Sequence, residues 1–297
     1  MAASAQPARF FFRNSGLVKM HLHLHLGLHK TATSHLQALL QVSSGRFPES
    51  TRYIPNPIVR QNLTVGYNAK KAYAFFESVA SLDAKNIIIS EENICGHSYG
   101  FFHNTEFYAD LEKRLDRLDF LNDMFDTIDI WVSIRNQATF IPSIYCEALR
   151  WGKFQGLDKL LAGNFHQSWV PVIKTMSSAF EKARVRVLLY ENYHENLPEL
   201  FEALTGCPYE AELSPQQTIN RSLNAMSVRL AARCNALLPF SLPPAAVTGL
   251  HTLTRDFSRG KYSPFTSPQQ DLLKQLYQQD KTELKRQSNS ENFGRGW

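Results

Sequence analysis

A strictly alternating segment that runs directly into a helical one constrains the fold of this chain most. Across residues 18–28, leucine and methionine alternate with histidine and glycine, which is the period-two pattern of a β-strand. Residues 31–42 then carry leucines at helical spacing, and the pattern stops at Ser43-Ser44-Gly45. The chain therefore opens with a strand, a tight turn and a helix.

Further short apolar runs predict buried strands, and helical stretches separate them. This alternation predicts an α/β fold with a mainly parallel central sheet and helices on both of its faces. From about residue 223 onward the pattern is mostly helical. The expected strands are residues 86–90, 128–134 and 185–190, and the expected helices are about 107–125, 138–151 and 196–205.

Length and composition favour one domain of ordinary globular character. The chain has 297 residues, of which 43% are hydrophobic and 20% are charged. We expect a domain over residues 18–287, preceded by an extension at 1–17 and followed by a disordered tail at 288–297. Met20 directly precedes the first strand and is a candidate start.

Several classes of protein are disfavoured by simple patterns. No run approaches the roughly 18 apolar residues of a membrane-spanning helix, and no signal peptide is recognisable, so we expect a cytoplasmic protein. The four cysteines form no C-x-x-C pair and are expected to be reduced thiols. The formal charge of +5 suggests that the protein handles an anion, and nothing in the pattern indicates nucleic-acid binding.

The turn after the first strand is the strongest candidate for a binding site. It reads Gly27-Leu28-His29-Lys30-Thr31-Ala32-Thr33-Ser34, and it leads from a strand into a helix N-terminus. Backbone N–H groups, a lysine and several hydroxyls converge there, which suits a phosphate group. No glycine immediately precedes Lys30, so the turn is not a Walker A loop. The alternative is an ordinary Thr/Ser cap on a structural helix.

This turn resembles the 5′-phosphosulfate loop of the sulfotransferases that use 3′-phosphoadenosine 5′-phosphosulfate (PAPS). Their pattern is a strand followed by Lys-[Ser/Thr]-Gly-Thr-[Thr/Ser], and here alanine stands where glycine is usual. His35 stands where many members have an aromatic residue. The resemblance implies cofactor-binding roles for Lys30, Thr31, Ala32, Thr33, Ser34 and His35.

A second segment strengthens this resemblance. In the family, an arginine at a strand end and a serine eight residues later bind the 3′-phosphate of the cofactor, and Arg135 and Ser143 stand in that relation. Guanidinium offers a fixed, charge-assisted fork for phosphate oxygens. Relatives also close over the nucleotide with a late basic loop, which here is Arg259-Gly260-Lys261. A plain surface turn is the alternative for that loop.

The resemblance covers roughly residues 18–285 and is closest to bacterial carbohydrate-type members. Weaker similarities lie at residues 90–93, 190–192 and 220–222. It implies a P-loop-like sulfotransferase fold and transfer of a sulfuryl group from PAPS to an acceptor hydroxyl, leaving 3′-phosphoadenosine 5′-phosphate (PAP). Lys30 is expected at the bridging oxygen of the leaving phosphate.

The acceptor hydroxyl must lose a proton as it attacks, and relatives use a glutamate or a histidine for this step. Two glutamates follow the strand at 86–90, at the end where open α/β sheets bind ligands. Glu92 is the first choice for the base, and Glu91 and His97 are the next candidates. The alternative is a solvated acidic pair at a strand end.

Histidines at 21, 23 and 25 share one face of the first strand and raise the question of a metal site. Parallel strands are covered on both faces, so we expect these rings to pack or hydrogen-bond beneath a helix, and we assign no metal.

The acceptor is expected to be a carbohydrate or glycolipid hydroxyl, or the tyrosine of an acidic peptide. We expect segments 46–80 and 95–110 to form its pocket. The alternatives are a nucleotide-dependent kinase and a non-catalytic binding protein. The sequence leaves the acceptor and the oligomeric state open.

Overall fold

The fold is an α/β arrangement around a five-stranded parallel sheet, as the sequence predicts. The computed structural model describes residues 19–98, 100, 102, 106–151, 156–157, 161, 165–215, 223–238, 242–254, 257 and 260–287. The strand order is β2-β3-β1-β4-β5, so the first strand lies at the centre. The strands are β1 (His21–His25), β2 (Thr51–Ile54), β3 (Asn86–Ser90), β4 (Thr127–Ile134) and β5 (Ala183–Leu189).

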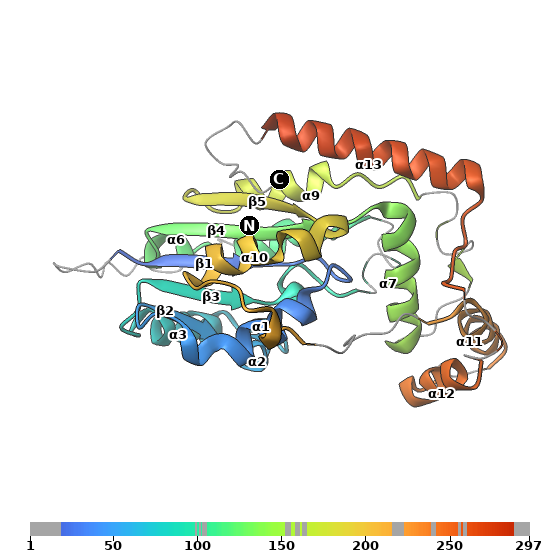
Figure 1. The fold of residues 1–297 in the computed structure, drawn as a ribbon, viewed down its shortest axis with the longest axis horizontal. Coiled ribbons are helices and arrows are strands. Elements are labelled where there is room, and N and C mark those ends of the chain that lie inside the picture. Colours follow the sequence, from blue (N-terminus) through green and yellow to red (C-terminus); the bar gives the residue numbers. More distant parts are fainter. Residues whose placement is uncertain are drawn as a thin grey trace, which may run out of the picture.

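Helices connect the strands and cover the sheet (Figure 1). The part that precedes β5 contains α1 (Thr33–Ser43), α2 (Asn56–Leu63), α3 (Ala69–Ala80), α5 (Leu111–Asp116), α6 (Leu121–Met124), α7 (Gln137–Trp151) and α9 (Val170–Ser178). The part that follows it contains α10 (Tyr193–Thr205), α11 (Ala225–Leu237), α12 (Pro244–Thr254) and α13 (Ser267–Gln287). Short 3₁₀ turns follow α1 (Ser44–Arg46), β3 (η2, Glu92–Ile94), β5 (η3, Tyr190–Asn192) and α10 (Ala211–Leu213).

Alternate residues of β1 face opposite sides of the sheet, where two different hydrophobic cores lie. Leu22 and Leu24 are fully buried in the larger core, together with residues of α3, α7 and α9. The histidine face of β1 lies on the side where α1 and α10 pack against Ile88 and Trp131. Both faces of the sheet are therefore covered, as expected for parallel strands.

The histidines of β1 hydrogen-bond within this packing, as the sequence predicts. His25 Nδ1 lies 2.8 Å from Ser90 Oγ on the neighbouring strand. His23 Nδ1 accepts a hydrogen bond from Trp131 Nε1 at 3.3 Å. Both imidazoles are almost completely buried, at 5% exposure for His23 and 2% for His25.

Two expected elements differ clearly from the structure, and one strand was not expected. The first strand ends at His25, because the backbone turns at Gly27, where φ is +35°. The expected helix at 107–125 is divided into two short helices, α5 and α6. In the residues between them, backbone N–H groups donate to the carbonyl three residues earlier, as Leu118 does to Leu115, which is the pattern of a 3₁₀ turn. The sequence missed β2, whose four residues are too few to show a period.

The carboxyl ends of β1, β3, β4 and β5 meet at one edge of the sheet, because these strands pair in parallel register. The predicted phosphate turn, the Glu91-Glu92 pair and Arg135 follow three of these ends. Helix α7 lies at that same end of the sheet in Figure 1, with α11 and α12 beyond it. Among the described residues, no helix has the length and apolar character needed to cross a membrane.

Because His23, His25 and His29 are buried, we expect the protein to lose stability in mild acid. Burial lowers the pKa of His23 to about 3 and the pKa values of His25 and His29 to about 4. Between these values and the unfolded value near 6.5, the unfolded chain binds more protons than the folded one, so stability falls as the pH drops. We expect a loss on the order of 1–2 kcal/mol per histidine between about pH 7.5 and pH 5.

Urea unfolding at both pH values measures this loss. A His25→Asn variant keeps a polar group near Ser90 but does not titrate in this range, so its stability should depend less steeply on pH. Equal free energies of unfolding at the two pH values would contradict the prediction.

Candidate functional site

The turn between β1 and α1 has the backbone of an anion-binding loop. A Cβ atom added at Gly27 would lie 2.5 Å from Thr33 Oγ1 and 2.8 Å from His25 Cε1, so only glycine fits there. Lys30 and Ala32 both adopt left-handed backbone conformations, with φ of 63° and 68°. Such turns aim successive N–H groups at one point, which suits a phosphate or sulfate.

Helix α1 begins at this turn and adds the positive end of its dipole. Its N-cap residue is Ala32, and no described side chain caps the helix. The hydroxyls of Thr31 and Thr33 donate to the carbonyl of Leu28, which stabilises the turn from within. These two predicted cofactor hydroxyls are thus engaged inside the loop. Ser34, the next hydroxyl along the chain, is half-buried.

Arg135 contacts this loop directly, although it lies about a hundred residues later in the chain. Its Nη1 donates to the backbone carbonyl of Lys30 at 2.8 Å, and its Nε donates to Thr139 Oγ1 at 3.0 Å. The guanidinium carbon also lies 4.3 Å from the centre of the Tyr190 ring. The two predicted anchor segments therefore form one site.

Helix α7 carries one polar face along this site. Thr139, Ser143 and Glu147 are spaced four residues apart and so share a side of the helix. Thr139 contacts Arg135 at one end, and Glu147 Oε2 lies 3.4 Å from Lys30 Nζ at the other. Ser143, predicted to bind the 3′-phosphate, lies on the turn between them.

Groups remote in sequence fix the Arg135 segment. Trp169 Nε1 donates to the Arg135 carbonyl at 2.8 Å, and the Asn136 N–H donates to Glu191 Oε1 at 2.9 Å. The hydroxyl of Tyr277, on α13, donates to the other oxygen of Glu191 at 2.6 Å. Burial and the neighbouring Glu191 carboxylate raise the pKa of Tyr277 well above its usual value, so the donor stays protonated. The sequence showed no signal for this role of Tyr277.

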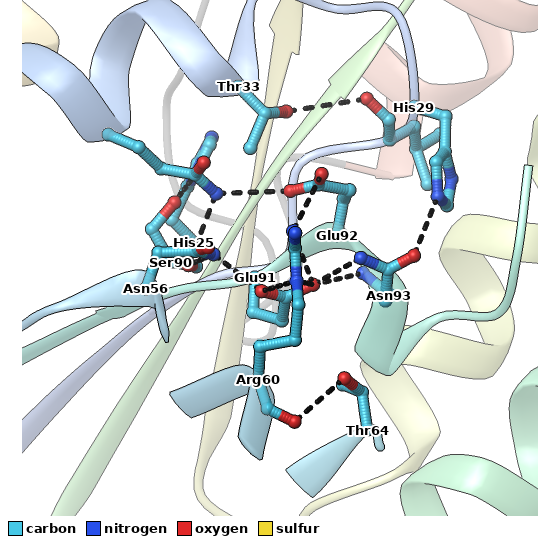
Figure 2. Close-up of polar contacts among 12 residues, drawn as sticks. His25, His29, Thr33, Asn56, Arg60, Thr64, Ser90, Glu91, Glu92 and Asn93 are labelled. Carbon is cyan, nitrogen blue, oxygen red and sulfur yellow. Dashed lines mark hydrogen bonds and ion pairs between the residues drawn. The ribbon is translucent and has the colours of Figure 1, made fainter. Parts of the chain in front are cut away.

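The two glutamates after β3 have different surroundings (Figure 2). Glu91 is completely buried and accepts hydrogen bonds from Asn56, Arg60 and Asn93. Glu92 retains 15% exposure and is contacted by Gln37 Nε2 at 3.0 Å and Arg60 Nη2 at 3.4 Å. Glu91 is thus enclosed by donors, while Glu92 keeps a surface that can meet a substrate.

A hydrogen-bond chain connects these acids to the turn between β1 and α1. The Tyr108 hydroxyl accepts from the His29 N–H and lies 3.1 Å from His29 Nδ1, while His29 Nε2 lies 3.4 Å from Asn93 Oδ1. Asn93 in turn donates to Glu91. Figure 2 shows His29 and Asn93 facing each other beside Glu92. Because His29 directly precedes Lys30 in the chain, the lysine and the candidate base lie at the same edge of the sheet.

The remaining predicted residues lie around this centre. His97 lies at the surface. The buried part of its side chain and the nearby positive charge of Arg114 lower its pKa. His35 bonds to Tyr193 and Ser214, so its ring is fixed on the α10 side of the loop. Gly260 and Lys261 pair with the start of α11, and both are exposed.

Tyr262, the next residue, brings this late segment to α7, because its ring centre lies 5.8 Å from that of Tyr145. Arg259 and segment 220–222 lie outside the described residues.

A second polar cluster lies at the opposite edge of the sheet and does not favour a cation. His21, His23 and Asp129 line a cleft of about 280 Å³ and are spaced closely enough to suggest a metal site. Asp129, however, accepts from Arg184 at 2.9 Å and Arg186 at 3.1 Å. Burial alone would raise the pKa of Asp129, but its hydrogen bond with His21 and the charges of the two arginines lower it to about 2. His23 Nδ1 already accepts from Trp131. The cluster is therefore an ion-pair network in which Asp129 is shared by the two arginines and by His21, whose Nε2 lies 3.2 Å from Asp129 Oδ2.

Comparison with protein-family models finds no match, and comparison with curated proteins finds no matching relative.

The left-handed residue at position 32 predicts a stabilising substitution. Alanine pays a steric cost in this conformation that glycine avoids, so Ala32→Gly should raise the free energy of unfolding by about 0.5–1 kcal/mol. The matched control is Ala74→Gly at an exposed position within α3, which should lose about 1 kcal/mol. Thermal or urea unfolding of both variants measures the difference. A loss of stability in both would show that the loop does not require the left-handed conformation.

Proposed function

We propose that this protein is a sulfotransferase that moves a sulfuryl group from PAPS to an acceptor hydroxyl, on a P-loop-like sulfotransferase fold. The observation that carries the proposal is the hydrogen bond from Arg135 to the Lys30 carbonyl. It brings a phosphate-type loop and a strand-end arginine together, and this supports binding of a nucleotide with phosphates at both its 5′ and 3′ positions, because guanidinium forms charge-assisted hydrogen bonds to phosphate.

In this proposal the loop of residues 30–34 binds the 5′-phosphosulfate through backbone N–H groups and the N-terminus of α1. Arg135 and Ser143 bind the 3′-phosphate. Arg135 has the geometry for this role, because its side chain is held by Thr139 and Tyr190 and so loses little freedom when it binds. Lys261 lies on the late segment that reaches α7 and adds a positive charge beside the nucleotide.

The chemistry is an in-line displacement at sulfur. The acceptor oxygen forms a bond to sulfur while its proton passes to the Glu92 carboxylate, and the bond from sulfur to the bridging phosphate oxygen breaks. Lys30 stabilises the negative charge that develops on the leaving phosphate. Burial of Glu91 among donors supports the choice of Glu92, because a general base must be able to reach the acceptor proton.

Binding of PAP tests the donor assignment. We expect calorimetry to show that the wild-type protein binds PAP more tightly than adenosine 5′-diphosphate, which lacks the 3′-phosphate. Arg135→Ala should weaken PAP binding by about 10–100-fold, since it removes a charge-assisted phosphate contact. Arg52→Ala, at an exposed position on β2, is the matched control. Absence of PAP binding would overturn the assignment, and a preference for ATP with Mg²⁺ would favour the kinase alternative.

Turnover of Glu92→Gln tests the base. In an assay with labelled PAPS and a panel of glycans and tyrosine peptides, this variant should lose about 10²–10⁴-fold in kcat and bind PAP normally. Glu91→Gln should instead lower thermal stability, because it changes a buried carboxylate that Arg60 contacts. Near-wild-type turnover by Glu92→Gln would remove Glu92 from this role.

A further inference from the structure

The ammonium group of Lys30, which is proposed to contact the leaving phosphate, forms an ion pair with Glu147. Lys30 Nζ lies 3.4 Å from Glu147 Oε2, and the two side chains are 17% and 23% exposed. Arg150 Nη1 lies 3.6 Å from the same carboxylate oxygen, from one turn further along α7. A half-buried carboxylate thus lies between two cations at a site proposed to bind a multiply charged anion.

This carboxylate opposes anion binding in two ways. A phosphate that contacts Lys30 must replace Glu147 as the partner of the ammonium group, and it also approaches the negative charge of Glu147. Partial burial makes both effects larger than they are between fully solvated groups. Nothing in the proposed transfer requires an acid at this position, because Glu92 already serves as the base.

We propose that Glu147 is a positioning residue for Lys30: the lysine exchanges Glu147 for the leaving phosphate when the donor binds and returns to Glu147 when PAP leaves. This inference rests on the proposed function. Arg150 provides the second partner that keeps the Glu147 charge compensated while Lys30 is engaged elsewhere. The exchange limits how tightly the product is held, so PAP dissociates readily after transfer.

Calorimetry of PAP binding to Glu147→Gln tests the exchange. Glutamine keeps the shape of the side chain but removes its charge, so we expect PAP to bind about tenfold more tightly than to wild type. A residue with only a structural role would leave the affinity unchanged or weaken it. Glu283→Gln is the matched control, because it removes the same charge from an exposed ion pair on α13.

The same substitution in a Lys30→Met background tests whether Glu147 acts through the lysine. We expect most of the tenfold gain to disappear there, leaving only the part that comes from direct repulsion. An undiminished tenfold gain would show that Glu147 acts without the lysine and would overturn the positioning role. Wild-type PAP binding with no gain for Glu147→Gln would overturn this inference alone. Failure of the wild-type protein to bind PAP would overturn the proposed function as well.

Discussion

The hydrogen bond from the Arg135 guanidinium to the Lys30 carbonyl is the contact on which the rest of the site depends. It joins the segment after β1 to the segment after β4, and these segments meet because β1 and β4 are neighbouring parallel strands. A left-handed loop such as this is not stable alone, since its alanine and lysine both pay a steric cost. The guanidinium, Thr31 and Thr33 compensate part of that cost by bonding the loop carbonyls.

Polar groups buried beneath this edge keep the two catalytic candidates in a defined relation. Glu91 collects donors from α2 and from its own turn, and His29 connects that turn to the loop through Asn93. Burial lowers the pKa of His29 to about 4, so the imidazole is neutral near pH 7 and adds no charge beside Lys30. Among the described residues, Glu147 forms an ion pair with the loop lysine at 3.4 Å.

Much of the architecture follows from local pattern. The alternation in β1 and the short apolar runs of β3, β4 and β5 predict the parallel sheet, because each side-chain parity must be buried. The motif segments could also be placed at the carboxyl edge of the sheet from sequence, since each follows a strand, whereas their order along that edge comes from the structure. The break between α5 and α6 and the short strand β2 could not be predicted, because tertiary packing decides such brief elements.

What the sequence determined by itself is the set of chemical groups: a lysine turn, an arginine eight residues before a serine, and two adjacent acids. What only the tertiary structure decided is how these groups differ in environment. Glu91 and Glu92 are chemically identical, yet one is enclosed by donors and the other keeps an accessible surface. Likewise, only the folded chain brings Glu147 to Lys30 and Tyr277 to Glu191. Burial and pairing depend on contacts between distant segments, and no local pattern encodes them.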